Sequence, residues 1–116
     1  PDHPDESFAE ALLRIIGEKG RTDEEVRRRA NIDRRVFGKI RGGRSCAPDK
    51  KTALALAVSL ELTLAETAGL LERADSALSR GALSDVIAEY FITRGRYDIH
   101  EINIVLFKHD QPLLGV

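Results

Sequence analysis

Groups able to make or break bonds are few and scattered in this chain. His100 and His109 are nine residues apart, so they lack the i, i+4 spacing by which two ligands share one face of a helix, and His3 stands alone near the start. Cys46 is the single cysteine, and no histidine stands near it in the sequence to act as its base. There is no glycine-rich phosphate loop. We therefore predict a protein without enzyme activity, metal site or cofactor.

Basic side chains, in contrast, are concentrated in one segment. Between Arg21 and Lys51 the sequence has 11 Lys/Arg against 5 Asp/Glu, whereas the other residues have 7 against 14. Because the net charge of the whole chain is only −1, a basic segment is combined with an acidic remainder. This separation is typical of a nucleic-acid-binding surface. A charged face that is merely solvated gives the same pattern.

Two short helices joined by a tight turn would position these cations. Thr22 and Glu25 have the spacing of a capping box for the first helix. Asn31 tolerates the left-handed backbone that ends a helix, and Asp33 is a natural N-cap for the second helix, which Gly42-Gly43 would end. The apolar residues expected in the core of this unit are Val26, Ala30, Ile32, Phe37 and Ile40.

A helix, a turn of three or four residues and a second helix with a basic free face form a helix-turn-helix signal over residues 22–41. The spacing of the buried residues, the glycine stop, Pro48 before the next helix and the run TALALAVSLELTL at 52–64 resemble the lambda-repressor-like (Cro/repressor-type) helix-turn-helix family. The resemblance covers roughly residues 7–75. It implies a five-helix bundle that binds double-stranded DNA.

The resemblance assigns roles to the basic residues. Arg34 and Arg35, at the leading end of the second helix, are candidates for contacts with base edges, since arginine offers a bidentate fork to guanine. Candidate phosphate contacts, which would set the register on the duplex, are Lys39, Arg41, Arg44, Lys50 and Lys51.

Three positions depart from the family pattern. Arg27 stands where the family has a small alanine between the two helices, and we expect its head to reach solvent. Asp23 stands where the family commonly has a phosphate-contacting glutamine. Asn31 replaces the turn glycine.

The remaining helices follow from caps and apolar spacing. We predict a first helix from Ser7 to Lys19 with Ser7 and Glu10 as a capping box, a fourth helix opened by Pro48, and a fifth capped by Thr63 and Glu66. A sixth helix would be capped by Ser84. Its apolar stripe would consist of Leu83, Val86, Ile87, Tyr90 and Phe91.

A seventh helix would follow Asp98, although its segment 104–107 is also rich in strand formers. The predicted fold class is all-α. It consists of a linker-like stub at 1–6, the five-helix bundle at 7–75 and a two-helix extension at 76–116 packed on it as one unit. The extension looks like tails on bacterial proteins that attach a helix-turn-helix-like unit to unrelated effector domains. Its candidate dimer or docking residues are Tyr90, Phe91, Ile102, Phe107, Leu113 and Leu114.

The composition indicates which class of protein the chain belongs to and where it would be found in the cell. With 42% hydrophobic residues in 116, the chain can bury a core, and it has neither an apolar run near the roughly 20 residues of a membrane helix nor a signal-peptide pattern. A lone cysteine suits a reducing cytoplasm. The chain begins with Pro1 and contains no methionine, which we interpret as a processed product or a piece of a longer protein.

Two functions fit these features. The first is sequence-specific binding of duplex DNA, by a transcriptional regulator or by the DNA-binding module of a larger bacterial protein. The second is a non-catalytic interaction or adaptor module, antitoxin-like or appended to an effector domain, that keeps the fold without DNA readout. Asp23 and Asp33 favour the second, because an aspartate at a helix N-terminus occupies the place where a phosphate would dock.

Overall fold

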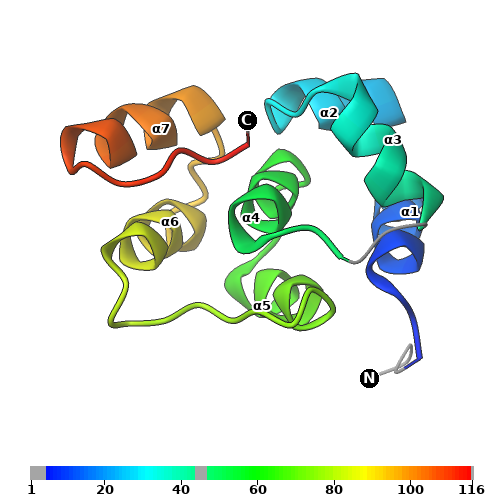
Figure 1. Cartoon of the computed structure of the whole chain (residues 1–116), viewed down its shortest axis with the longest axis horizontal. Helices are drawn as coiled ribbons and strands as arrows, with labels where there is room; N and C mark the ends of the chain where they lie inside the picture. The colour runs from blue at the N-terminus through cyan, green and yellow to red at the C-terminus, as the bar shows by residue number, and fades with distance from the viewer. Residues whose placement is uncertain (1–4, 44–46, 116) are drawn as a thin grey trace.

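Seven α-helices and no strand form the described part of the computed structural model, which comprises residues 5–43 and 47–115. This confirms the predicted all-α class. For residues 104–107 the sequence is compatible with either a helix or a strand, and in the structure they belong to helix α7. The helices shown in Figure 1 are α1 (Phe8–Glu18), α2 (Asp23–Arg29), α3 (Arg34–Gly42), α4 (Lys50–Ser59), α5 (Leu64–Glu72), α6 (Leu83–Thr93) and α7 (Ile99–Lys108).

Local caps explain where most of these helices begin. Ser7 starts α1 and Thr63 starts α5, each in the predicted capping box with the glutamate three residues on. The box predicted for α2 is only half formed. Thr22 accepts the backbone N–H of Glu25, but the Glu25 carboxylate pairs with arginines instead of returning to the cap. Asp98 caps α7 as expected.

Two predicted helix starts are wrong. Helix α4 begins at Lys50 and is capped by Asp49, which accepts the N–H of Thr52 at 3.0 Å, so Pro48 precedes the helix and does not form its first turn. Helix α6 begins without any side-chain cap, after Ala82, and Ser84 lies inside its first turn. Asp49, the residue directly before α4, therefore marks the start of this helix, and Pro48 does not.

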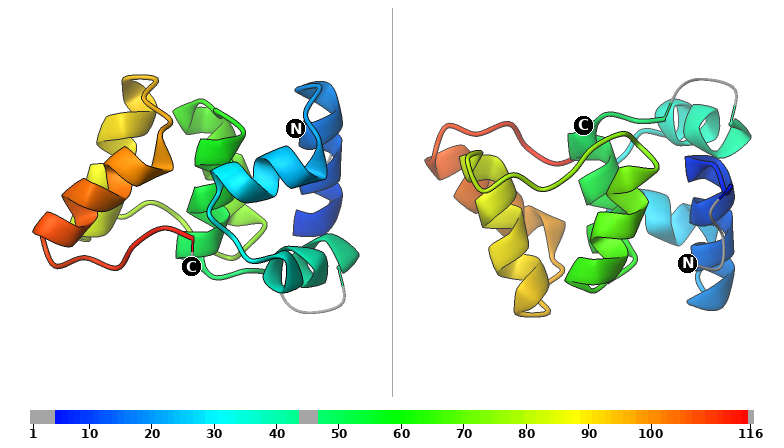
Figure 2. Two further views of the ribbon diagram at one scale, coloured as in Figure 1. Left: turned by 90° about the horizontal axis from the view of Figure 1, so that it is seen from above. Right: turned by 90° about the horizontal axis from the view of Figure 1, so that it is seen from below.

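The core is centred on α4. All residues of α4 from Thr52 to Ser59 are buried, as expected for a helix surrounded by others. It packs against α2, α5 and α7, while α1 packs on α3 and α5, and α6 on α5 and α7 (Figures 1 and 2). Side chains of α6 and α7, such as Phe91 and Leu106, belong to the same apolar cluster as Leu56 of α4. The two C-terminal helices therefore share the core of the other five.

The buried face of α6 differs from the predicted stripe. Ile87 and Phe91 point inward as expected, but Leu83, Val86 and Tyr90 are exposed. The inward face instead includes Asp85, which is only 3% exposed. Its carboxylate accepts hydrogen bonds from Lys50 Nζ and the Ser79 backbone N–H, both at 2.8 Å. With Asp85 on the inward face, part of the predicted apolar stripe lies in solvent.

Three of the residues proposed for docking are also buried inside the chain. Phe91, Ile102 and Leu114 are part of the core and present no surface to a partner, because their side chains are buried in the common apolar cluster. Tyr90, Phe107 and Leu113 are exposed. Among the described residues, no helix is long and apolar enough to cross a membrane.

Candidate nucleic-acid interface

The α2–α3 pair is held as a unit by its turn. Asn31 adopts the left-handed conformation, with φ of +58°, and Asp33 accepts the N–H of Arg35 at 2.8 Å to cap α3. At the far end, Gly43 with φ of +64° closes α3. The five residues predicted for the core of this unit are all buried: Val26, Ala30, Ile32, Phe37 and Ile40.

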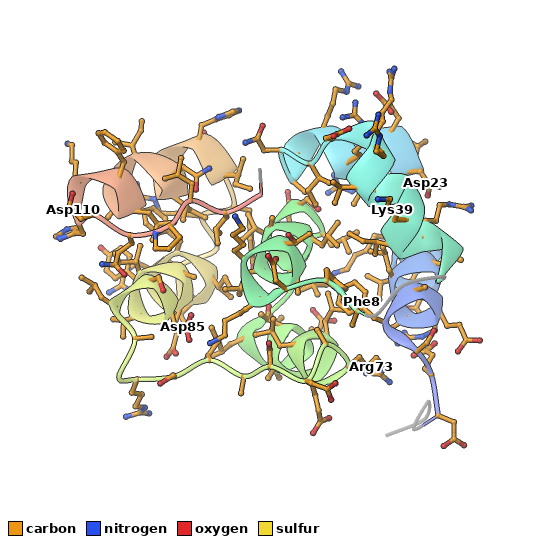
Figure 3. All side chains as sticks on the ribbon, viewed as in Figure 1. Phe8, Asp23, Lys39, Arg73, Asp85 and Asp110 are labelled. Atoms are coloured by element: carbon orange, nitrogen blue, oxygen red, sulfur yellow. The ribbon has the colours of Figure 1, made fainter. Side chains whose placement is uncertain are left out.

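Packing leaves one face of α3 free. Phe37 and Ile40 face α1 and the core, which places the charged residues of α3 on the opposite side. Figure 3 shows nitrogen-ended side chains projecting outward from α2 and α3, with Lys39 labelled on α3. The pair therefore presents a fixed, basic surface to solvent.

Arg34 and Arg35 lie at the start of α3 and both are exposed. Arg35 makes no side-chain hydrogen bond or ion pair with any residue in 5–43 or 47–115. The side chain of Arg34 is 78% exposed and touches one carboxylate, that of Glu24, at 3.2 Å. An ion pair this exposed contributes little stability and yields readily to another anion. Both guanidinium groups are thus available at the leading end of the helix.

Glu24 is the centre of a cluster of arginines. It accepts two hydrogen bonds from Arg27, at 2.6 and 3.1 Å, and lies 3.9 Å from Arg28 in addition to its contact with Arg34. The hydrogen bonds from Arg27, followed by the one from Arg34, lower the pKa of the Glu24 carboxyl to about 2. Glu24 is therefore ionised at any pH near neutrality.

Arg27 does not send its head freely to solvent as we expected. Its side chain is 16% exposed, and besides Glu24 its Nη1 donates to the backbone carbonyl of Ile32 at 2.9 Å. The guanidinium so links the end of α2 to the turn before α3. Arg27 therefore has a structural role within the α2–α3 unit.

The four candidate phosphate contacts within the described residues differ in their surroundings. Lys39 and Lys51 are exposed and make no ion pair within the described ranges. Arg41 pairs with Asp23 at the start of α2. Lys50 faces α6, where it binds the buried Asp85, so we remove it from the phosphate set. Arg44 lies outside the described residues.

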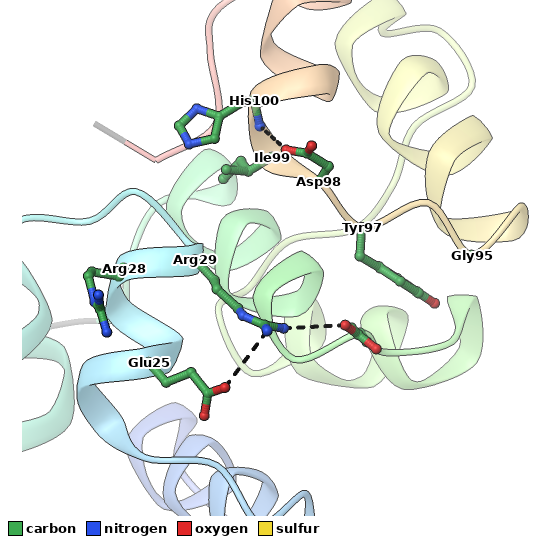
Figure 4. A pocket seen from close by; sticks show the side chains of 9 residues that line it. Glu25, Arg28, Arg29, Gly95, Tyr97, Asp98, Ile99 and His100 are labelled. Atoms are coloured by element: carbon green, nitrogen blue, oxygen red, sulfur yellow. Dashed lines mark hydrogen bonds and ion pairs between the residues drawn. The ribbon is translucent and has the colours of Figure 1, made fainter.

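A groove beside α2 was not foreseen from the sequence. It has a volume of about 700 Å³ and lies between α2 and the start of α7, lined by Arg28, Arg29, Tyr97 and His100 among others (Figure 4). Arg29 is held there by Glu25 at 3.8 Å and Glu61 at 3.4 Å. Its walls combine three carboxylates, those of Glu25, Glu61 and Asp98, with the two arginines, so the groove is not a basic surface. Within the described part of the chain, no three metal-ligating side chains come together.

We expect the stabilising effect of the Glu24 carboxylate to depend on pH in the acid range. Because the folded-state pKa of Glu24 is near 2 against an ordinary 4.5, its contribution to stability is present above about pH 4.5 and is lost as the pH falls towards 2. The difference in urea midpoint between wild type and Glu24→Gln should therefore shrink between pH 4.5 and pH 2.5. Glu72→Gln, at an exposed site on α5, is the control. A constant difference across this range would contradict the assignment.

Comparison with known proteins adds no further assignment. No protein-family model matches the chain, and searches of curated proteins and of solved structures found no match.

Proposed function

We propose that the chain binds double-stranded DNA, with α3 entering the major groove of the duplex. In this proposal α1–α5 are a helix-turn-helix domain of the lambda-repressor kind, and α2 crosses the sugar–phosphate backbone. Arg34 and Arg35 reach base edges from the first turn of α3, where the recognition helix of such domains makes its base contacts.

One observation carries the proposal: an exposed Arg35, without an ion pair in the described residues, in the first turn of a helix whose other face is buried. The packed helix fixes the backbone from which the Arg35 guanidinium projects, and no ion pair with another described residue has to be broken before that group can meet a base. Bidentate hydrogen bonds from arginine to the O6 and N7 atoms of guanine are the commonest specific contact in the major groove. Arg34 supplies a second fork beside it.

The acidic first turn of α2 limits how many phosphates the surface can hold. Asp23, Glu24 and Glu25 occupy the helix end that would otherwise attract a phosphate. Arg41 must also leave Asp23 before it can reach the backbone of the duplex. We therefore assign about three to four phosphate contacts, drawn from the exposed cations Lys39, Lys51, Arg28 and Arg41.

A salt titration tests this function. With about three to four phosphates neutralised, the logarithm of the binding constant for a duplex should fall with the logarithm of salt concentration with a slope of about −3 to −4. Fluorescence anisotropy of a labelled random-sequence duplex gives this slope directly. An absence of binding at low salt, or a slope near zero, would contradict the proposal.

An interaction module is the second candidate, and exposed apolar residues on α7 favour it. Ile104 and Phe107 are 57% and 74% exposed and lie three positions apart, on one face of the helix. Large apolar side chains in solvent at neighbouring positions are a feature of docking surfaces.

If a second copy of the chain docks there, Phe107→Lys should raise the dimer dissociation constant at least tenfold without changing the helix content. Sedimentation over a range of concentrations measures this. Equal association of wild type and variant would exclude self-docking through this face.

A further inference from the structure

The C-terminal segment 110–115 returns from the end of α7 to the α2–α3 turn. Asp110 reverses the chain with φ of +56°, and Gln111 donates its backbone N–H to Leu106 at 2.9 Å. The segment then runs back beside α7 and reaches the connection between α2 and α3 at Gly115 (Figures 1 and 2). Segments about 80 residues apart in the sequence thus meet at one point.

A side-chain amide of α7 fixes this returning segment. Asn103 Oδ1 accepts the backbone N–H of Leu114 at 2.8 Å, and Asn103 Nδ2 donates to the carbonyl of the same residue at 3.1 Å. The two bonds satisfy both backbone groups of Leu114, whose side chain is buried in the core. The backbone at this position is therefore specified by α7.

The next residue presses on the turn. Gly115 has φ of +78°, and a Cβ atom placed on it would lie 2.5 Å from the carbonyl oxygen of Ala30 and 2.8 Å from that of Asn31. Only a glycine allows the backbone to approach those carbonyls so closely. Other left-handed glycines, Gly20 and Gly95, would have nothing within 4 Å of such a Cβ. The close approach is specific to the contact with the turn.

We propose that residues 111–115 are a brace that positions α3 by holding the α2–α3 turn from behind, with Asn103 and Gly115 as its two positioning residues. The turn sets the angle at which α3 leaves α2, and the brace makes that angle depend on α7. A molecule that binds α7 and withdraws the segment would then loosen the recognition helix. The link to DNA affinity rests on the proposed function, whereas the brace itself does not.

Amide hydrogen exchange of the full chain tests the brace without DNA. The N–H groups of Asn31 and Ile32 are bonded to the carbonyls of Arg28 and Arg27, so their exchange reports the closed turn. Gly115→Ala should speed the exchange of both amides at least tenfold, while the amide of Leu71 in α5 stays within twofold of wild type. Gly95→Ala is the matched control, because it carries the same left-handed strain without a clash.

A second variant tests the brace without the added methyl group of Gly115→Ala, which could disturb the structure as a whole. Asn103→Leu removes both bonds to Leu114 and should speed the same two amides. If Asn31 and Ile32 exchange as in wild type in both variants, or if every amide of the chain speeds up equally, the brace is wrong.

Binding to a random-sequence duplex separates the brace from the proposed function. Gly115→Ala should weaken binding at least fivefold relative to Gly95→Ala. A wild-type chain that binds no duplex, with the exchange effects present, overturns the proposed function and supports the brace. Equal duplex binding by the two glycine variants overturns the link between the brace and α3.

Discussion

Asp85→Ala is expected to lower the free energy of unfolding by about 2–3 kcal/mol, the largest effect on stability among the polar residues considered. The carboxylate is almost fully buried and binds both Lys50 Nζ and the backbone N–H of Ser79. Removing it leaves the Ser79 N–H without its acceptor and Lys50 without its partner. Lys50 keeps 35% of its side chain exposed and can turn to water, which holds the cost below that of a fully buried charge.

Urea unfolding followed by circular dichroism measures this loss. Glu72→Ala removes an exposed acid from α5 and should change the unfolding free energy by less than about 0.5 kcal/mol. The double variant Lys50→Met with Asp85→Ala should cost less than the sum of the two single changes, because the pair acts as one unit. Equal stability of Asp85→Ala and Glu72→Ala would show that Asp85 does not anchor α6.

Arg35→Ala is expected to weaken binding to a preferred duplex by about 1–3 kcal/mol, equivalent to roughly fivefold to 150-fold. Preference at one base pair should relax, while the salt slope stays nearly unchanged, because a base contact rather than a phosphate contact is lost. The fold should be unaffected, since Arg35 is exposed and its backbone N–H keeps its bond to Asp33.

Arg80→Ala provides the matched control for this experiment. Arg80 is exposed in the connection between α5 and α6, so its loss changes the net charge by the same amount away from α3. It should leave affinity within about twofold of wild type. Equal losses for the two variants would mean that Arg35 contributes only general charge.

Local chemistry made much of this fold predictable. The caps at Ser7, Asp33, Thr63 and Asp98 depend on neighbours within three residues, and each was correctly placed. The continuous apolar run of α4 marked the central helix for the same reason: its pattern needs no knowledge of a partner. The all-helical class follows from such signals.

Partners distant in the sequence decided what was missed. The carboxylate of Asp85 lies inward, where it accepts a hydrogen bond from Lys50, which is 35 residues away in the chain. The sequence alone does not identify Asp85 as the partner of Lys50, which is why we predict a phosphate contact for Lys50 from the sequence. Gly115 gave no local signal, since its close approach to Ala30 exists only once the chain has returned to the turn.

Some features of the α2–α3 surface could also not be read from residue types alone. Arg27 and Arg34 are the same kind of residue, yet one is held within the turn and the other is largely free. Their positions relative to Glu24 and the Ile32 carbonyl make the difference, and these depend on the angle between two helices. The sequence shows that basic residues are concentrated in this segment, but residue types alone do not distinguish the arginines from one another.

Amide chemical-shift mapping tests most directly whether the free face of α3 meets a duplex. A random-sequence duplex is added to the labelled full chain at low salt, where non-specific contacts suffice for binding. We expect the largest shifts to cluster in residues 33–43 and at Lys51, with α5 and the exposed side of α7 unchanged. Shifts confined to α6 and α7, or no shifts at all, would contradict the account.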